Sequence, residues 1–405
     1  MKPIVRAGRM KPVHSDIRGP LFVEAMKRQK QGIDILKLNT GNPATFGFGL
    51  PDSIKNALIE HMQDGVGYCD FKGMPQARQA ICDYETSKGI KGITSDDVFI
   101  GNGVSEVVSF ALTPLLNDGD EVLVPSPSYS LWGNSVYLED GKPVFYTCDE
   151  QANWYPDIKD IRSKITDKTK AIVIINPNNP TGVLYPKEIL LEIIQVAREF
   201  GLLIFADEIY DRLVMDGKQH ISLASLTEDV PVITLNGLSK SHCLCGYRCG
   251  WMVISGPREL TEDYRQGIIQ LTSLRLCANT MAQIVIPAAL DDMETPASMV
   301  RPGGRIYEQR EATVRELEKI DGLSFVKNDA AFYVFPKLDV KKFNITNDKQ
   351  FAHDLLDATN ILLVPGSGFD WKDPDHFRIV MLPQADILSD AIRRMGTFLD
   401  GYKQK

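Results

Sequence analysis

Three short apolar segments, each ending in polar residues, constrain the fold of this chain more than any other feature. They are residues 170–175, 202–206 and 231–235, and they are rich in isoleucine, valine and leucine, as the buried strands of parallel sheets are. Residues 186–200 have helical spacing, and Gly201 after them is a typical helix end. The alternation of strands and helices predicts an α/β fold with a mostly parallel sheet.

Polar side chains follow each of these predicted strands. Asn179 follows the first, Asp207 and Tyr210 follow the second, and Lys240 follows the third. Ligands of open α/β sheets bind outside the carboxyl ends of the strands, so we expect the four side chains to converge on one site. Taken singly, three of them have ordinary alternatives, namely a turn-forming asparagine, a helix-capping aspartate and a solvated lysine.

The segment around Lys240 is suited to an aldehyde cofactor that carries a phosphate. A lysine amine can form an imine with an aldehyde, and Ser239 and Arg248 offer hydrogen-bond donors to a phosphate. Gly246 and Gly250 allow the backbone to approach closely. Together these residues point to pyridoxal phosphate.

A second predicted phosphate-binding element lies earlier in the chain. Gly103, Val104 and Ser105 follow the strand-like residues 97–100 and precede the helical residues 106–116. The backbone amides at a helix N-terminus favour an anion, so we expect a phosphate there.

Over residues 36–378 the chain resembles the fold-type I pyridoxal-phosphate aminotransferases of class I/II, the group of aspartate and alanine aminotransferases. Within it, the chain is most similar to the bacterial alanine (glutamate-pyruvate) aminotransferases, through Asp-Ile-Arg-Gly-Pro at 16–20, Gly-Asn-Pro-Ala at 41–44 and Gly-Asn-Gly-Val-Ser-Glu at 101–106. The resemblance implies transfer of an amino group between alanine and 2-oxoglutarate by a ping-pong path, with pyruvate and glutamate as the other pair.

The resemblance also implies how the cofactor is held. Lys240 both tethers it and moves the substrate proton, and Asp207 pairs with the pyridine nitrogen. Asn179 and Tyr210 bind the phenolic oxygen, and Tyr129 stacks on the ring, although a buried core tyrosine is the alternative. The implied phosphate contacts are Gly103, Val104, Ser105, Ser239, Arg248 and, from the neighbouring subunit, Tyr68.

The implied substrate contacts are Arg378, Asn179, Gly41 and Arg18. Arg378 binds the α-carboxylate through a bidentate pair, and Arg18 binds the distal carboxylate of glutamate while leaving room for alanine. Two departures from the family pattern affect the pocket. Ser15 stands where a larger aromatic residue is expected, and Asp-Ala-Ala-Phe-Tyr at 329–333 replaces the more usual Gly-Ala-aromatic-Tyr.

The expected architecture is a large domain with a seven-stranded, mostly parallel sheet between helices, and a small α+β domain from both ends of the chain. The large domain spans residues 43–289, and the small domain combines 1–42 with 290–405. Residues 308–320 predict an amphipathic helix and 331–335 a strand. A shared site that includes Tyr68 implies a homodimer.

Composition narrows the partners. The chain has 405 residues and a net charge of −8, which argues against nucleic acid or an anionic membrane as the main partner. No apolar stretch approaches the length of a membrane span, and the first residues have no apolar signal core, so a cytoplasmic protein is expected.

The seven cysteines form no disulfide framework, and reduced thiols are expected. Cys243, Cys245 and Cys249 cluster with His242, but they lack a matching Cys-x-x-Cys pair, so no metal site is expected. Reversible oxidation near Lys240 is more plausible, because neighbouring cations favour a thiolate.

Other functions are weighed against these motifs. A dinucleotide-dependent oxidoreductase is disfavoured, because Glu106 stands where the third glycine of the Gly-x-Gly-x-x-Gly motif is needed after Gly101 and Gly103. A non-catalytic binding or regulatory protein would be expected to lose Lys240, which this chain retains. An aromatic or broad-specificity aminotransferase and a C–S β-lyase remain open, since fold and cofactor do not fix the reaction.

Overall fold

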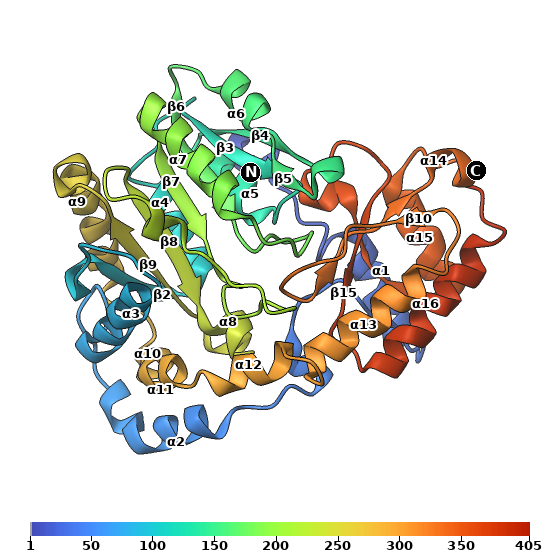
Figure 1. Cartoon of the computed structure of the whole chain (residues 1–405), viewed down its shortest axis with the longest axis horizontal. Coiled ribbons are helices and arrows are strands. Elements are labelled where there is room, and N and C mark those ends of the chain that lie inside the picture. Colours follow the sequence, from blue (N-terminus) through green and yellow to red (C-terminus); the bar gives the residue numbers. More distant parts are fainter. Residues whose placement is uncertain (1) are drawn as a thin grey trace.

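The computed structural model describes residues 2–405, in which a large mixed sheet lies beside a smaller α/β region (Figure 1). Among these residues the large sheet has eight strands. They are β2 (Val98–Asn102), β3 (Glu121–Ser126), β4 (Lys142–Asp149), β5 (Tyr155–Pro156), β6 (Thr169–Ile175), β7 (Leu203–Asp207), β8 (Val232–Gly237) and β9 (Cys249–Ser255). The shorter strands elsewhere are β1 (Leu36–Lys37), β10 (Leu323–Ser324), β11 (Tyr333–Val334), β12 (Lys337–Leu338), β13 (Ile361–Leu362), β14 (Val364–Pro365) and β15 (Phe377–Val380).

The helices fall into two groups, one around the large sheet and one in the smaller region. Those around the sheet are α2 (Asp52–His61), α3 (Pro75–Ser87), α4 (Val104–Leu112), α5 (Leu131–Leu138), α6 (Ile158–Lys164), α7 (Lys187–Phe200), α8 (Leu238–Ser241), α9 (Arg258–Arg275), α10 (Thr280–Ile284), α11 (Ile286–Asp291) and α12 (Glu294–Val300). Those of the smaller region are α1 (Pro20–Lys30), α13 (Arg305–Leu317), α14 (Val340–Phe343), α15 (Asp348–Thr359) and α16 (Ala385–Leu399).

The large sheet is mostly parallel, as the sequence predicts. Its strand order is β2-β9-β8-β7-β6-β3-β4-β5, and β4, β3, β6, β7 and β8 run parallel to one another. Strand β9 is antiparallel to both of its neighbours. The expected seven strands become eight because the two-residue β5 pairs antiparallel with the end of β4 at the sheet edge.

The three apolar segments of the sequence form β6, β7 and β8, and they are apolar throughout because helices cover both faces of the sheet. In β6, Ile172 and Ile174 face the core that contains α7, whereas Ala171, Val173 and Ile175 face the core that contains α4 and α9. Alternate side chains of one strand therefore enter two separate cores.

Helix α7 ends where the sequence predicts. Gly201 follows it with φ +66°, a left-handed conformation that glycine adopts without the steric cost of a Cβ. The helix is amphipathic, and its buried face includes Leu190, Ile193 and Ala197. This face lies against the sheet next to β6 and β7.

The smaller region joins the N-terminal helix to the last third of the chain. Leu317 of α13, Phe351 of α15 and Ile392 of α16 share one core. The predicted helix 308–320 is α13, displaced three residues toward the N-terminus, and the predicted strand 331–335 is reduced to β11. The domain boundaries expected from the sequence stay predictions.

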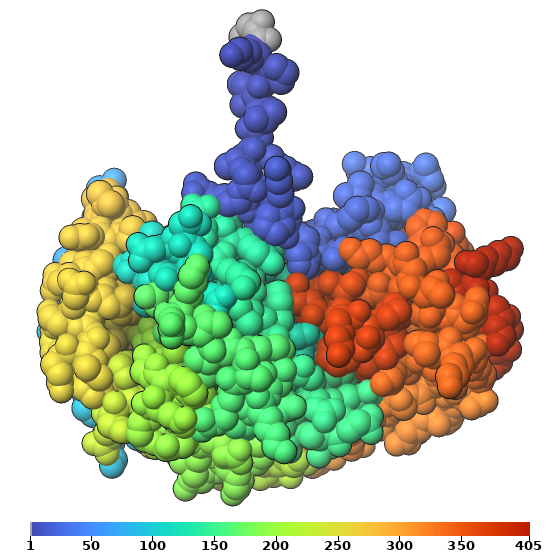
Figure 2. Space-filling model, turned by 90° about the horizontal axis from the view of Figure 1, so that it is seen from above, coloured from blue at the N-terminus to red at the C-terminus, as the bar shows by residue number. Residues whose placement is uncertain are grey.

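The first described residues form an arm that projects from the body of the molecule (Figure 2). Ile4 and Val5 in this arm are 102% and 82% exposed. Within residues 2–405, no single helix is long and apolar enough to cross a membrane; only the sharply bent pair α9 and α10–α11, taken together, passes on length and composition.

Candidate active site

A cavity of about 910 Å³ lies where β6, β7 and β8 end. Its walls come from the turns after these strands, from the starts of α4 and α5, and from the smaller region. The residues predicted from the sequence that line it are Arg18, Gly41, Val104, Ser105, Tyr129, Asn179, Asp207, Tyr210, Ser239, Lys240, Arg248 and Arg378. The structure therefore brings together side chains that lie as far apart in the sequence as Arg18 and Arg378.

Two predicted residues do not line this cavity. Gly103 lies behind it, with φ +86°, and a Cβ at this position would collide with the guanidinium of Arg248. Tyr68 is 83% exposed and lies outside the cavity of its own chain. The structure of one chain therefore leaves the side chain of Tyr68 available to another molecule.

Lys240 reaches the cavity from α8, the single turn that follows β8. Its Nζ donates a hydrogen bond to the carbonyl of Gly41 at 2.9 Å and lies 3.9 Å from the Sγ of Cys245. Burial acts to lower the pKa of Lys240, but the adjacent Tyr333 and Cys245 raise it, and the net shift is upward. A raised pKa favours the ammonium form, so the amine must lose a proton before it can act as a nucleophile or base.

Asp207 ends β7 and is 5% exposed. Its carboxylate accepts hydrogen bonds from the indole Nε1 of Trp132 at 3.1 Å and from the backbone of Ile209 at 3.4 Å. Burial raises the pKa of Asp207 to about 6, and the bond from Trp132 opposes that shift. Burial makes the ionised form of Asp207 costly, and a cationic partner would offset that cost. Asp207 is therefore suited to pair with a protonated ring nitrogen.

Tyr210 forms a pair with Tyr333 from β11. Their hydroxyls lie 2.8 Å apart and their rings meet edge to face with centroids 5.6 Å apart. Gly41 lies against this pair, and a Cβ there would collide with the Tyr333 hydroxyl. Burial raises the pKa of Tyr210 well above its ordinary value, so its hydroxyl keeps its proton and can donate it to a hydrogen bond.

Arg378 on β15 is only 1% exposed and lies between the rings of Tyr333 and Phe369, 4.6 Å from each centroid. It donates to the side-chain oxygen of Asn179 at 2.9 Å and to the carbonyl of Asn39. Its Nε has no partner, and no carboxylate in residues 2–405 pairs with it. Burial lowers the pKa of Arg378. A buried cation without a counterion is suited to bind a carboxylate from outside the protein.

Another part of the cavity wall, around Arg248, is suited to a phosphate. Arg248 donates to the hydroxyl of Ser105 at 3.1 Å and to the carbonyl of Cys245 at 3.0 Å, and no ion pair joins it to a carboxylate anywhere in the described chain. The N-terminus of α4 lies beside it, and a Cβ on Gly250 would collide with the backbone nitrogen of Val104. Free backbone amides and an uncompensated guanidinium form a cradle for an anion.

Arg18 lines the cavity from the N-terminal segment and is exposed. No hydrogen bond or ion pair involves it among the described residues, whereas its neighbour Asp16 is held by His14 and Lys349. Ser15 lines the same part of the wall. The backbone of this segment is thus fixed while the guanidinium of Arg18 remains unpaired at the cavity.

Comparison with known proteins identifies the family. The model of the aminotransferase class I and II family matches residues 33–392. The chain belongs to this family. It is 49% identical to the glutamate-pyruvate aminotransferase AlaA of Haemophilus influenzae over the full length of both proteins, and 45% identical to the alanine aminotransferase of Mycobacterium tuberculosis over 100% of this chain and 94% of that protein. The solved structure of an aminotransferase from Escherichia coli superposes on this chain over the full length of both, with 47% identity and a TM-score of 0.98.

Class I and II aminotransferases depend on pyridoxal phosphate, so the enzyme class and cofactor expected from the sequence are confirmed. The cavity fits this group, because its wall includes both the phosphate cradle around Arg248 and the buried carboxylate of Asp207. A dinucleotide-dependent oxidoreductase is excluded by the family match.

Two residues of this aminotransferase site were missed or left without a role in the sequence. Trp132 carried no assignment, yet it is fully buried and donates to Asp207. Tyr333 was noted only within a departure from the family pattern, yet it contacts Tyr210 and Arg378. The position of Trp132 three residues after Tyr129 was the one available signal, and only the folded chain shows its partner.

The expectation of a reactive thiolate beside Lys240 is wrong for two of the three clustered cysteines. Burial raises the pKa of both Cys243 and Cys249 to about 12, which keeps them as thiols. Cys245 remains at the cavity wall, where its thiol lies 2.9 Å from the carbonyl of Ser239. All seven cysteines are free.

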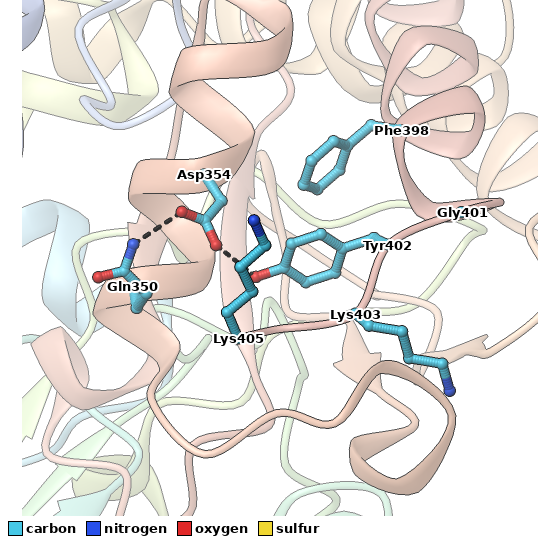
Figure 3. Close-up of a pocket in the computed structure, with 7 residues that line it drawn as sticks. All are labelled: Gln350, Asp354, Phe398, Gly401, Tyr402, Lys403 and Lys405. Atoms are coloured by element: carbon cyan, nitrogen blue, oxygen red, sulfur yellow. Dashed lines mark hydrogen bonds between the residues drawn. The ribbon is translucent and has the colours of Figure 1, made fainter.

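A second hollow lies near the C-terminus, between α15 and the end of α16 (Figure 3). Its one carboxylate, Asp354, already accepts hydrogen bonds from Gln350 and Tyr402, both at 2.7 Å. The side chains of Lys403 and Lys405 lie along its edge. None of the sequence motifs falls in this hollow.

Proposed function

We propose that this aminotransferase moves an amino group between alanine and 2-oxoglutarate, with pyruvate and glutamate as the other pair, by a ping-pong path. The names of relatives at 45–49% identity support this reaction. The structural observation that carries it is Arg378, a buried guanidinium with no counterion in the described chain, which fits the carboxylate shared by all four substrates.

Pyridoxal phosphate, when bound, supplies an electron sink for the pair released as the Cα–H bond breaks. We assign the phosphate of the cofactor to Val104, Ser105, Ser239 and Arg248, with Gly103 directly before Val104 in the turn. Asp207 is assigned to the pyridine nitrogen, Asn179 and Tyr210 to the phenolic oxygen, and Tyr129, 37% exposed at the cavity wall, to the ring face.

Lys240 is proposed to move the reacting proton. Its amine is within reach of the cavity, and the bond to the Gly41 carbonyl gives it a fixed starting position. Once neutral, the Lys240 amine would accept the proton from the substrate Cα and would carry it to the cofactor. Asp207, kept away from water by Trp132, stabilises positive charge at the ring nitrogen during this transfer.

Arg18 is proposed to distinguish the two substrate pairs. Glutamate and 2-oxoglutarate carry a distal carboxylate that alanine and pyruvate lack. Arg18 lies at the cavity wall and makes no hydrogen bond or ion pair with any other residue in 2–405. Alanine leaves Arg18 to water, whereas glutamate engages it. Because Arg18 and Arg378 belong to the smaller region, substrate binding draws that region toward the sheet and excludes water.

A homodimer is the proposed active unit. Six exposed apolar side chains lie on α2, on the segment that follows α2, and at the end of α9. They are Ile59, Met62, Val66, Tyr68, Leu274 and Leu276. Their exposed fractions range from 50% to 83%, which is costly for a monomer. A second copy that covers them brings Tyr68 to the phosphate of its partner. A cytoplasmic location is part of the same proposal.

Rapid-mixing measurements of the separate half-reactions test the proposal. The cofactor-loaded protein is mixed with alanine or glutamate, and the aminated form with pyruvate or 2-oxoglutarate. We expect all four compounds to react. The initial visible spectrum of the cofactor should return after an amino acid and then an oxo acid have reacted. Release of pyruvate and ammonia from an amino acid with a sulfur leaving group on Cβ, without an amino acceptor, would instead indicate a C–S lyase. A preference for aromatic donors would indicate a broad-specificity aminotransferase.

A further inference from the structure

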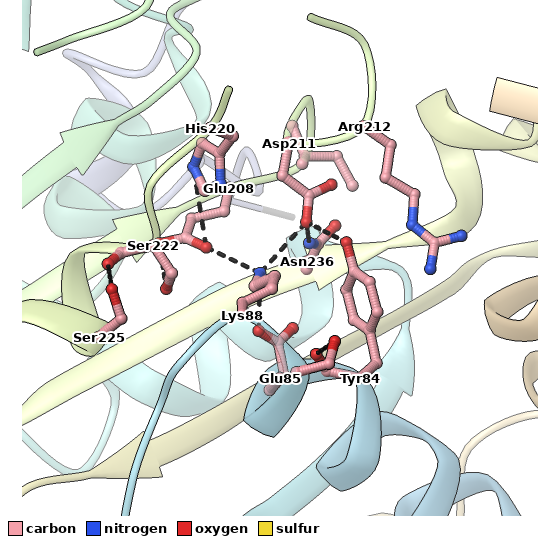
Figure 4. Close-up of polar contacts among 12 residues, drawn as sticks. Tyr84, Glu85, Lys88, Glu208, Asp211, Arg212, His220, Ser222, Ser225 and Asn236 are labelled. Atoms are coloured by element: carbon pink, nitrogen blue, oxygen red, sulfur yellow. Dashed lines mark hydrogen bonds and ion pairs between the residues drawn. The ribbon is translucent and has the colours of Figure 1, made fainter. Parts of the chain in front are cut away.

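Lys88 lies in a buried charged cluster (Figure 4). Neither Lys88 nor the carboxylates around it line the cavity. It follows the last residue of α3, and its Nζ lies 2.7 Å from a carboxylate oxygen of Glu85, 2.9 Å from Glu208 and 3.1 Å from Asp211. The three carboxylates are at most 8% exposed. We call these four residues, together with Tyr84 and Asn236, the Lys88 cluster.

Each carboxylate is fixed by further hydrogen bonds. Glu208 accepts from the Ser222 hydroxyl at 2.9 Å and from the backbone of Leu223 at 3.0 Å. Asp211 accepts from the Tyr84 hydroxyl at 2.5 Å and from the Asn236 amide at 2.7 Å. Glu85 accepts from the indole of Trp251 at 3.1 Å. With so many fixed donors, the cluster has one arrangement.

The cluster joins two segments that carry site residues. Glu208 directly follows Asp207, and Asp211 directly follows Tyr210. Asn236 lies at the end of β8, and its side-chain oxygen accepts the backbone N–H of Gly237 at 2.7 Å, at the start of the turn that carries Lys240. The ammonium of Lys88 therefore ties α3 to the turn 207–211 and, through Asp211 and Asn236, to the turn before Lys240.

Lys88 is the central positive charge of the cluster. Burial acts to lower its pKa, but Glu208, Glu85 and Asp211 raise it well above the ordinary value, so it stays charged. Burial raises the pKa of Glu85, while burial of Asp211 is outweighed by Lys88, which lowers the Asp211 pKa. These groups depend on one ammonium for compensation.

The remaining ionisable groups around the cluster do not replace that ammonium. Burial lowers the pKa of His220, which keeps it neutral, and its Nε2 is 3.2 Å from the Asn176 carbonyl. Arg212 stacks on the Tyr84 ring at 4.3 Å and donates to the carbonyls of Ala289 and Leu290. Glu208, Asp211 and His220 could together offer three metal ligands, but Lys88 already occupies the space between the two carboxylates.

We propose that Lys88 is a positioning residue for transamination, which sets the distances among Asp207, Tyr210 and Lys240 by holding Glu208 and Asp211, the carboxylates at either end of the 208–211 segment. The inference rests on the proposed roles of those three residues. It assigns a function to a group that touches neither substrate nor cofactor. Without Lys88, Glu208 and Asp211 repel each other in a buried space, and the turn that carries Asp207 and Tyr210 has to move.

The test is Lys88→Met, which removes the charge and keeps most of the side-chain length. We expect kcat to fall roughly 10- to 100-fold with little change in KM for alanine, because Arg378 is untouched and only the reacting groups are displaced. The midpoint pH of the visible absorption change of the cofactor-loaded protein should rise by about one unit. The substitution removes the positive charge of Lys88 and weakens the hydrogen bond from Tyr210 to the phenolic oxygen of the cofactor. In the cofactor-free protein, hydrogen exchange should accelerate at residues 207–211.

Arg265→Met is the matched control. Arg265 is also a buried cation, 5% exposed and 2.6 Å from the Asp97 carboxylate, but it contacts neither turn. This variant should unfold at a lower temperature and keep the absorption midpoint and the exchange at 207–211 unchanged. Tyr84→Phe covers the case in which Lys88→Met fails to fold, because it deletes only the hydroxyl that donates to Asp211. It should shift the midpoint in the same direction by a smaller amount.

The outcomes separate the inference from the proposed function. A wild-type protein that forms no visible band with pyridoxal phosphate and does not turn over alanine would overturn both. If the wild-type protein has the band and turns over alanine, then a normal midpoint, kcat and exchange rate in Lys88→Met, or in Tyr84→Phe should Lys88→Met not fold, would overturn the positioning role alone. Equal shifts in Arg265→Met would also overturn it, because the effect would then follow from lost stability.

Discussion

At the scale of single residues, the site is defined by charged groups that lack their usual partners. Within residues 2–405, Arg378 is buried without a carboxylate partner, and Arg248 lies beside a helix N-terminus without one. Asp207 is buried with two neutral donors. Such groups cost free energy in the empty protein, and a ligand of opposite charge recovers it. Each leads to a measurable expectation.

Lys240→Ala should remove the visible absorption of the cofactor-loaded protein, because no other amine is assigned to this position. Borohydride reduction followed by peptide mapping should place the wild-type label on Lys240. Label recovered on a different lysine would contradict the assignment.

The raised pKa of Asp207 predicts a pH dependence of stability in the cofactor-free protein. Its folded pKa of about 6 lies above the ordinary value of 3.8, so folding favours the protonated form. The stabilising contribution is complete below about pH 4 and is lost as the pH rises through 6. Asp207→Asn should remove that loss and be more stable than wild type at pH 8, by about 2 to 3 kcal/mol. Denaturant unfolding at pH 4 and pH 8 measures this difference.

In the loaded enzyme the same substitution should reduce transamination at least 100-fold, because the charge that Asp207 supplies to the ring nitrogen is gone. Higher stability with lower activity is the expected combination. A variant with near-normal turnover would show that Asp207 only caps the turn after β7 and has no role in the reaction.

Arg18→Met and Arg378→Met should have different effects on the two half-reactions. Loss of Arg18 removes a contact available only to the distal carboxylate, so the glutamate reaction should slow much more than the alanine reaction. Loss of Arg378 should slow both. Equal losses in Arg18→Met would remove Arg18 from substrate recognition.

At the scale of secondary-structure elements, the regular parts of the fold were predictable and the site's internal contacts were not. Strands β6, β7 and β8 and helix α7 follow from apolar runs and Gly201, because local patterns specify them. Strand β5 was not predicted, because two residues at a sheet edge carry no periodicity. The Trp132–Asp207 and Tyr210–Tyr333 hydrogen bonds join residues far apart in sequence, which no local pattern reports.

The turn into α4 gives a prediction at this scale. Gly103→Ala places a Cβ at positive φ and against the Arg248 guanidinium, so the variant should lose stability and also bind the cofactor more weakly. Gly119→Ala is the matched control, because its φ is +78° but its added Cβ comes no closer than 3.6 Å, to the amine of Lys168. It should share the loss of stability, roughly 1 to 2 kcal/mol, and keep the cofactor affinity. Equal cofactor affinity in both variants would contradict the role of this turn.

At the scale of the whole molecule, the site depends on contributions from both ends of the chain and, in the proposed dimer, from a second copy. Mixing Lys240→Ala chains with Tyr68→Ala chains tests the shared site. Each variant alone should be impaired, whereas a hybrid dimer has one site with neither change and should regain activity. Absence of recovery, with hybrid dimers shown to form, would place Tyr68 outside the partner's site.

Two parts of the cavity are built from different materials, which has a consequence for how this enzyme can evolve. The phosphate-binding part is packed so closely that a Cβ on Gly250 would collide with the backbone of Val104, and a Cβ on Gly103 with the guanidinium of Arg248. The far wall is made of exposed side chains, including Ser15 and Arg18. Selection for a different keto acid can therefore act on the far wall one side chain at a time, while the chemistry common to all substrates is inherited unchanged.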